Sequence, residues 1–132
     1  MTTRTATCGC GQLRATCSGE PVRISVCHCL ECQKRSGSAF AVQARWPEGQ
    51  VEQSGEYTEW SRSGDEGATA TFRFCPGCGS TVSYVNESMP GLVAVPVGTF
   101  ADPSFPAPTI SVYEGRQHAW VAVLGDGVER WE

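Results

Sequence analysis

Two cysteine motifs decide the fold of this chain: Cys8-Gly9-Cys10-Gly11 near the first residue and Cys75-Pro76-Gly77-Cys78-Gly79 beyond the middle. Two thiolates that are one or two residues apart can point at one ion when the backbone turns tightly between them, and glycine and proline supply such turns. Tetrahedral structural zinc takes four ligands. The two pairs together predict a Cys₄ zinc site that ties the start of the chain to a point far along it.

A third motif, Cys27-His28-Cys29-Leu30-Glu31-Cys32, supplies only three sulfur ligands. Three protein ligands with an open fourth position are typical of a zinc ion that takes part in chemistry. Three thiolates donate so much charge that such a zinc is a weak Lewis acid toward water, but it suits a further thiolate. We therefore expect Cys27, Cys29 and Cys32 to hold a catalytic zinc that accepts an external thiol and not a hydrolytic water.

Other arrangements of the cysteines stay open at this point. Cys17 or His28 could close the triplet into a second structural site. However, Leu13, Ala15 and Cys17 alternate as on the buried face of a strand, which favours a core thiol. In an extended backbone the side chain of His28 points away from those of its neighbours, which favours a place beside the site or at the surface. Disulfides are disfavoured because cysteines one residue apart rarely meet disulfide geometry.

The composition indicates a single globular domain over residues 1–132, with 40% hydrophobic and 18% charged residues. We expect a cytoplasmic protein, because residues 1–5 lead into no apolar signal segment and no apolar run is long enough to span a membrane. In that reducing compartment, eight cysteines indicate metal binding or catalysis. The net charge of −4 and the lack of a Lys/Arg cluster argue against a nucleic-acid partner.

Strand signals dominate the rest of the chain, and the expected architecture is mostly β with little helix. Short alternating or apolar runs bounded by glycine and proline predict strands over residues 12–18, 22–26, 39–46, 57–62, 68–74, 81–85, 92–97, 110–113 and 119–124. One or two helical turns are expected over residues 30–36, inside the cysteine triplet. Residues 100–108, which contain three prolines, predict an ordered loop or a lid.

The candidate substrate contacts directly follow the triplet. Lys34 and Arg35 come two and three residues after Cys32, where a cation can hold a carboxylate of a ligand whose sulfur reaches the zinc. Phe40 follows closely and is a candidate pocket wall. We expect Lys34, Arg35, Ser36 and Phe40 to bind substrate, with solvated surface charges and plain core packing as the alternatives.

The three cysteine motifs in this order, with Ser36-Gly37 after the triplet, resemble the glutathione-dependent formaldehyde-activating enzyme family, also called the GFA or centromere protein V domain family. The resemblance covers residues 4–124. It implies a zinc-stapled β-tent of short antiparallel strands, with a structural zinc on one set of cysteines and a catalytic zinc on the other. The structural set is Cys8, Cys10, Cys75 and Cys78, and the catalytic set is Cys27, Cys29 and Cys32.

The resemblance also implies an activity, which is the formation of S-hydroxymethylglutathione from formaldehyde and glutathione, a carbon–sulfur lyase reaction when written in reverse. The sequence is compatible with three functions. The first is an enzyme that adds a thiol, glutathione, to a small aldehyde. The second is a glutathione- or zinc-binding module without rate enhancement, and the third is a structural domain with two closed zinc sites.

Elemental analysis tests the predicted metal content. Protein purified without chelator is expected to contain two zinc ions per chain, one for each predicted site. A fall to one zinc after dialysis against millimolar glutathione indicates a triplet that is open to thiols. Retention of both ions without bound glutathione favours the structural domain instead.

Overall fold

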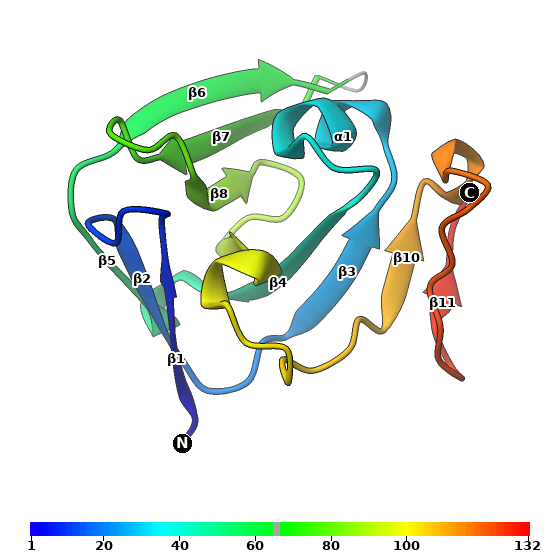
Figure 1. The fold of residues 1–132 in the computed structure, drawn as a ribbon, viewed down its shortest axis with the longest axis horizontal. Coiled ribbons are helices and arrows are strands. Elements are labelled where there is room, and N and C mark those ends of the chain that lie inside the picture. Colours follow the sequence, from blue (N-terminus) through cyan, green and yellow to red (C-terminus); the bar gives the residue numbers. More distant parts are fainter. Residues whose placement is uncertain (65–66) are drawn as a thin grey trace.

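The computed structural model describes residues 1–64 and 67–132, and over these residues the strands form two sheets (Figure 1). The smaller sheet has the order β1-β2-β5, and its strands β1 (Thr3–Thr7), β2 (Arg14–Ser18) and β5 (Val51–Ser54) are antiparallel. The larger sheet has the order β11-β10-β3-β4-β9-β8-β7-β6. Its strands are β3 (Arg23–Cys27), β4 (Ala41–Pro47), β6 (Thr58–Ser63), β7 (Thr69–Phe74), β8 (Thr81–Asn86), β9 (Leu92–Pro96), β10 (Ile110–Val112) and β11 (Glu129–Arg130).

Helical segments are few and short. The one α-helix of the described chain is α1 (Leu30–Ser36), and three 3₁₀ turns accompany it: η1 (Glu48–Gln50), η2 (Val97–Phe100) and η3 (Glu114–Arg116). No helix among these is long and apolar enough to cross a membrane. The expectation of a mostly β chain with one short helix over residues 30–36 is confirmed.

The strands expected between residues 12 and 113 are present, with ends that shift by one or two residues. The strand expected over residues 119–124 is wrong. Trp120 and Leu124 are 74% and 83% exposed, and the backbone N–H of Val121 donates to His118 in a turn, so this apolar alternation faces solvent. The edge of β10 pairs instead with β11, a strand that the sequence pattern did not predict, as it did not predict β1 and β5.

The expectation of antiparallel pairing holds for most neighbours but not for β10. This strand runs parallel to both β3 and β11. The long segment between β9 and β10, which contains η2 and the proline-rich residues 100–108, carries the chain back so that β10 starts at the same end as β3. The segment is ordered by turns such as the N–H of Phe105 donating to Asp102 at 3.1 Å.

The main core lies between the two sheets. Trp46 of β4 is fully buried there, donates its indole N–H to the carbonyl of Gly19 at 2.9 Å, and packs on Phe100 with ring centroids 5.8 Å apart. Leu13, which directly precedes β2, and Cys17 of β2 are fully buried in the same cluster. Burial raises the pKa of the Cys17 thiol to about 11, so Cys17 is a protonated core residue.

The eight-stranded sheet curves around α1. Strands β6 and β10 are far apart in the strand order, yet Figure 1 shows them on two sides of α1. The helix follows β3 directly. Its N-cap is Cys29, whose sulfur accepts from the N–H of Cys32, and its C-cap is Gly37, which adopts φ 70° and donates to the carbonyl of Gln33.

Gly55 is a position where the fold depends on a missing side chain. Its φ is +103°, and an added Cβ would lie 2.1 Å from the carbonyl oxygen of Gln12. We expect Gly55→Ala to lower the free energy of unfolding by about 2–3 kcal/mol, through strain and displacement of Gln12.

Gly49→Ala is the matched control, because a Cβ there meets nothing within 4 Å and its φ is not positive. Denaturant unfolding of the metal-loaded protein measures both variants. Equal stability of Gly55→Ala and Gly49→Ala would contradict the assigned strain.

Candidate metal centres and the adjoining cavity

Four cysteine sulfurs from two distant turns meet in one cluster. The sulfur atoms of Cys8, Cys10, Cys75 and Cys78 all lie within 4.8 Å of one another. Cys10 is 3.7 Å from Cys75 across the two turns, and the backbone N–H of Gly9 donates to the Ser80 hydroxyl at 3.1 Å. The turn between β1 and β2 therefore lies against the turn between β7 and β8 (Figure 1).

Both turns are built by local hydrogen bonds that aim the sulfurs inward. In the first, the N–H of Cys8 donates to Leu13 and the N–H of Gly11, at φ +85°, donates to Cys8. In the second, the N–H of Cys75 donates to Ser80 and the N–H of Gly79, at φ +82°, donates to Cys75. The left-handed φ at each turn is the reason for glycine there.

The surroundings of the cluster favour thiolates at Cys75 and Cys78. The side-chain amide of Gln12 donates to the Cys75 sulfur at 3.0 Å, which lowers the pKa of that thiol. The backbone N–H of Ser80 is the main cause of a lowered pKa at Cys78, about 5. Four convergent sulfurs with N–H donors aimed at them match the donor set and supporting hydrogen bonds of a structural zinc site, so a zinc ion fits here.

The second group contains three sulfurs. Cys27 at the end of β3, Cys29 at the N-cap of α1 and Cys32 in its first turn have their sulfur atoms within 4.8 Å of one another. Cys27 and Cys32 are buried, whereas Cys29 is only half-buried. No fourth His, Cys, Asp or Glu of residues 1–64 and 67–132 joins this group.

Hydrogen bonds among the three thiols favour a thiolate at Cys29. Cys27 and Cys32 donate to the Cys29 sulfur, which lowers the pKa of Cys29 to about 2 and raises the pKa of Cys27. A preformed thiolate flanked by two further sulfurs is a soft donor set, which fits zinc with three protein ligands.

His28 lies between two of these cysteines but points elsewhere. It is fully buried, its Nε2 is 3.0 Å from the Ser111 hydroxyl of β10, and its backbone N–H donates to Val112 at 3.1 Å. The surface position considered for His28 is therefore wrong, and the place beside the site is confirmed. His28 anchors the triplet to β10.

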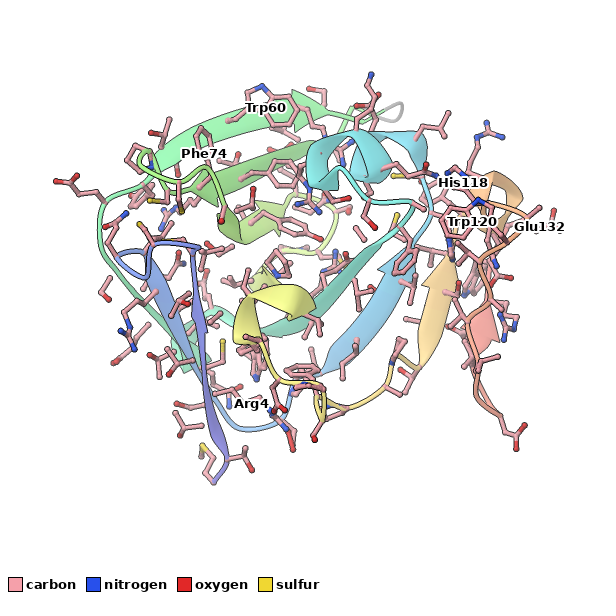
Figure 2. The ribbon with its side chains drawn as sticks, viewed as in Figure 1. Arg4, Trp60, Phe74, His118, Trp120 and Glu132 are labelled. Atoms are coloured by element: carbon pink, nitrogen blue, oxygen red, sulfur yellow. The ribbon has the colours of Figure 1, made fainter. Side chains whose placement is uncertain are left out.

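The sequence pattern did not indicate Gln33, yet its side chain supports the cysteine triplet. Its side-chain amide donates to the carbonyls of His28 and Arg116, at 2.8 and 3.3 Å, and its Oε1 lies 2.8 Å from Nε2 of His118. His118 packs in turn on Trp120, and Figure 2 shows the two residues to the right of α1. Gln33 thus joins the triplet to the segment that follows β10.

The predicted substrate residues occupy several different environments. Lys34 is exposed and pairs with Glu31 at 3.6 Å. The guanidinium of Arg35 stacks on Phe72 and on Tyr84, 5.0 and 5.2 Å from the ring centroids. The Ser36 hydroxyl donates to the carbonyl of Cys32 within α1 at 2.8 Å. The centroid of the Phe40 ring lies 6.4 Å from that of the His28 ring. Substrate contact by these four residues stays a prediction.

A cavity of about 340 Å³ opens beside the triplet. Arg62, near the end of β6, places its Nη2 3.9 Å from the Cys32 sulfur, and Arg116 of η3 also lines the cavity. The curved sheet thus brings together two arginines that are far apart in sequence. The residues that line the cavity are Cys29, Leu30, Glu31, Arg62, Ser63, Gly64, Tyr113 and Arg116.

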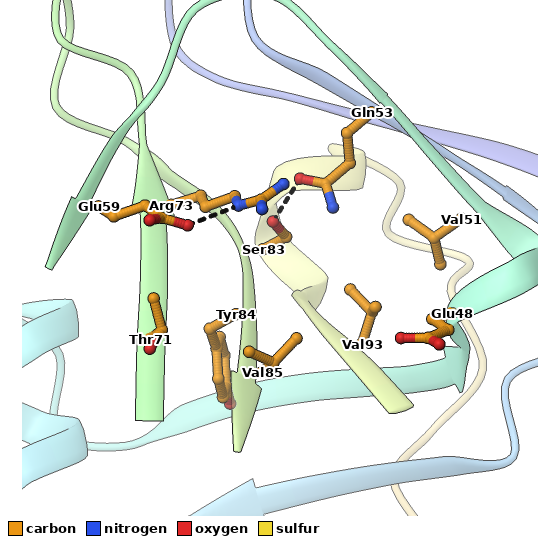
Figure 3. A pocket seen from close by; sticks show the side chains of 10 residues that line it. All are labelled: Glu48, Val51, Gln53, Glu59, Thr71, Arg73, Ser83, Tyr84, Val85 and Val93. Carbon is orange, nitrogen blue, oxygen red and sulfur yellow. Dashed lines mark hydrogen bonds and ion pairs between the residues drawn. The ribbon is translucent and has the colours of Figure 1, made fainter. Parts of the chain in front are cut away.

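A smaller cavity of about 230 Å³ lies between β5 and strands β6 to β9 (Figure 3). Four of its polar side chains pair with one another: Arg73 pairs with Glu59 at 3.1 Å, and the Ser83 hydroxyl donates to Gln53 at 2.6 Å. No cysteine lines this cavity, so the cavity beside Cys29 is the better candidate for chemistry.

Comparisons with known proteins agree with this geometry. The model of a family described as glutathione-dependent formaldehyde-activating enzyme matches residues 3–116. The chain is also similar to the crystal structure of a Rhodobacter sphaeroides protein, with a TM-score of 0.57 and 17% identity over 97% of this chain and 99% of that one. At that identity the likeness shows the fold alone. Comparison with curated proteins found no match.

The group of four cysteines joins two distant turns, whereas the triplet joins residues that are adjacent in sequence. This difference can be tested by substitution. Cys10→Ser is expected to lower zinc content by one ion and the free energy of unfolding by about 4 kcal/mol or more, because its site joins two distant turns. Cys29→Ser is expected to lose one zinc ion but to keep most of its stability, because residues 27–32 are adjacent in sequence. Elemental analysis and guanidinium unfolding measure both variants, and equal destabilisation would contradict the assignment.

Proposed function

The chain belongs to the glutathione-dependent formaldehyde-activating enzyme family, and from this premise we propose that it catalyses the addition of glutathione to formaldehyde, giving S-hydroxymethylglutathione. The observation that carries the proposal is the group of three cysteine sulfurs whose least buried member, Cys29, lines a cavity. We place the reaction in a single domain over residues 1–132, in the cytoplasm.

The reaction is an addition and needs no oxidant or reductant. The thiol sulfur forms a bond to the aldehyde carbon while the carbon–oxygen π bond breaks, and the thiol proton ends on the former carbonyl oxygen. The barrier falls when the thiol is held as a thiolate next to the aldehyde, because the thiolate is the nucleophilic form.

Cys27, Cys29 and Cys32 would hold the catalytic zinc, and Cys8, Cys10, Cys75 and Cys78 the structural one. When bound to the triplet, zinc supplies the positive charge that keeps a substrate thiol deprotonated.

A side chain of the protein itself also favours the thiolate form of the substrate. The Arg62 guanidinium, 3.9 Å from the Cys32 sulfur, adds a second positive charge at the cavity wall. Formaldehyde is small enough to enter beside glutathione in a cavity of about 340 Å³.

A kinetic experiment separates catalysis from binding. The rate of S-hydroxymethylglutathione formation, followed by exchange NMR at equilibrium, is expected to exceed the spontaneous rate with metal-loaded protein. The variant Cys29→Ser is expected to lose roughly 100-fold or more of that acceleration, because the site loses a ligand.

The control for this loss is Cys17→Ser, which changes a cysteine in the main core that belongs to neither sulfur group. Saturable glutathione binding by calorimetry without acceleration would overturn the enzyme and select the binding module. An unchanged acceleration in Cys29→Ser would remove the triplet from the mechanism.

A further inference from the structure

Strand β6 is a long free edge of the larger sheet. Its six residues, Thr58–Ser63, pair with β7 on one side, and no strand of the described chain pairs with the other side. Figure 1 shows β6 at the margin of the molecule, with β7 on its inner side. The opposite edge strand of the same sheet, β11, has only two residues. Most of the backbone that this sheet leaves unpaired at its edges therefore belongs to β6.

This strand lacks the features by which edge strands usually avoid pairing with another chain. Such strands are commonly short or bulged, or they carry proline or lysine. Thr58–Ser63 contains neither residue and pairs with β7 without a register shift. Its two charged residues, Glu59 and Arg62, have opposite signs, so they do not repel a second copy as a row of lysines would. Trp60 remains 49% exposed although its ring stacks on Phe72.

The hydrogen bonds of the β6–β7 hairpin determine which backbone groups face outward. Gly64 donates its N–H to the carbonyl of Ala68 at 2.8 Å, which makes these two residues a hydrogen-bonded pair. Such pairs alternate with non-hydrogen-bonded pairs along an antiparallel ladder. Along the register of the hairpin, every second residue of β6 therefore bonds to β7. The residues between them, Glu59, Ser61 and Ser63, direct their N–H and C=O groups to the free edge.

We propose that two copies of the chain pair through β6, antiparallel and symmetric about Ser61, so that their larger sheets become continuous. In this register Ser61 forms a hydrogen-bonded pair with Ser61 of the second copy, and Glu59 does so with Ser63. These are the residues whose backbone groups face the free edge. Asp65 and Glu66, which lie outside the described residues, are not part of the proposed contact.

The side chains of β6 are complementary to those of a second copy in this register. Trp60 lies opposite Arg62 of the second copy, on the face where both side chains contact Phe72 within one chain. Residues opposite each other in a non-hydrogen-bonded pair have Cα atoms about 4.5 Å apart, so the guanidinium can stack on the indole ring. On the other face, Glu59 lies opposite Ser63, and no like charges meet. A second copy therefore covers the exposed part of Trp60.

A contact of this kind is closed. The symmetry uses the free edge of β6 in both copies, and the two-residue strand β11 offers little backbone for further pairing, so we expect a dimer and not a filament. Because Arg62 also lines the cavity beside Cys29, the interface adjoins that cavity. The inference does not depend on the proposed function, since it concerns only the edge of the sheet.

Analytical ultracentrifugation of the metal-loaded protein tests the association. Wild-type protein is expected to approach twice the 14.1 kDa mass of one chain as its concentration rises. Hydrogen exchange followed by NMR locates the contact, because the N–H groups of Glu59, Ser61 and Ser63 are expected to gain protection in the dimer. A protein that stays monomeric up to about 1 mM overturns the proposal.

Two lysine substitutions on the same edge test the register. In Ser61→Lys the two ammonium groups lie opposite each other, and the dissociation constant of the dimer is expected to rise roughly fivefold or more. In Ser63→Lys each ammonium lies opposite Glu59 of the second copy, and the dissociation constant is expected to fall roughly threefold. Each variant is the matched control for the other, because both replace an exposed serine whose hydroxyl forms a hydrogen bond with a threonine of β7.

The possible results are distinct. Zinc content and denaturant unfolding show whether both variants fold, and hydrogen exchange of the wild-type protein decides the question without any variant. If both lysines weaken the dimer alike, the pairing symmetric about Ser61 is overturned. If neither lysine changes the dimer, or if the three amides stay unprotected in it, the copies join through another surface and the proposal fails.

Discussion

The convergence of four cysteine sulfurs at two distant turns is the constraint on which the rest of the molecule depends. It fastens the smaller sheet to the β7–β8 hairpin of the larger one, with Gly9 bonded to Ser80 and Gln12 to Cys75 across the junction. The same two strands carry Phe72 and Tyr84, and these rings support the arginines that face the triplet. The β7–β8 hairpin therefore connects the group of four sulfurs to the surroundings of the triplet.

The cysteine triplet, in contrast, joins residues that are close together in the sequence. Its three sulfurs come from residues 27–32, so its geometry is set by one strand end and one short helix. A local site adds little to global stability and can exchange a ligand without unfolding the chain. His28 and Gln33 compensate for this weak coupling, because their hydrogen bonds to Ser111 and Arg116 fix the triplet relative to the strand and turn beside it.

The parts of the fold that the sequence predicts are those determined over a few residues. Cysteine spacing, the helix after Cys29 and the alternation that buries Cys17 all belong to this class. The strand expected over residues 119–124 fails because an apolar alternation contains no information about a partner, and Trp120 is left in solvent. The sequence pattern also does not predict the parallel pairing of β10 with β3, because this pairing depends on the path of the long segment between β9 and β10.

The same limit applies to the cavity. Lys34 and Arg35 attract attention in the sequence because they are adjacent to Cys32, but Arg35 stacks on aromatic rings and Lys34 extends into solvent beside Glu31. Arg62 and Arg116 are isolated cations in the sequence, and only the curvature of the eight-stranded sheet brings them to one cavity. A net charge of −4 describes the whole surface and not this site. Among the described residues, the charged side chains that line the cavity are Arg62, Arg116 and Glu31, and the chain brings them there from three separate segments.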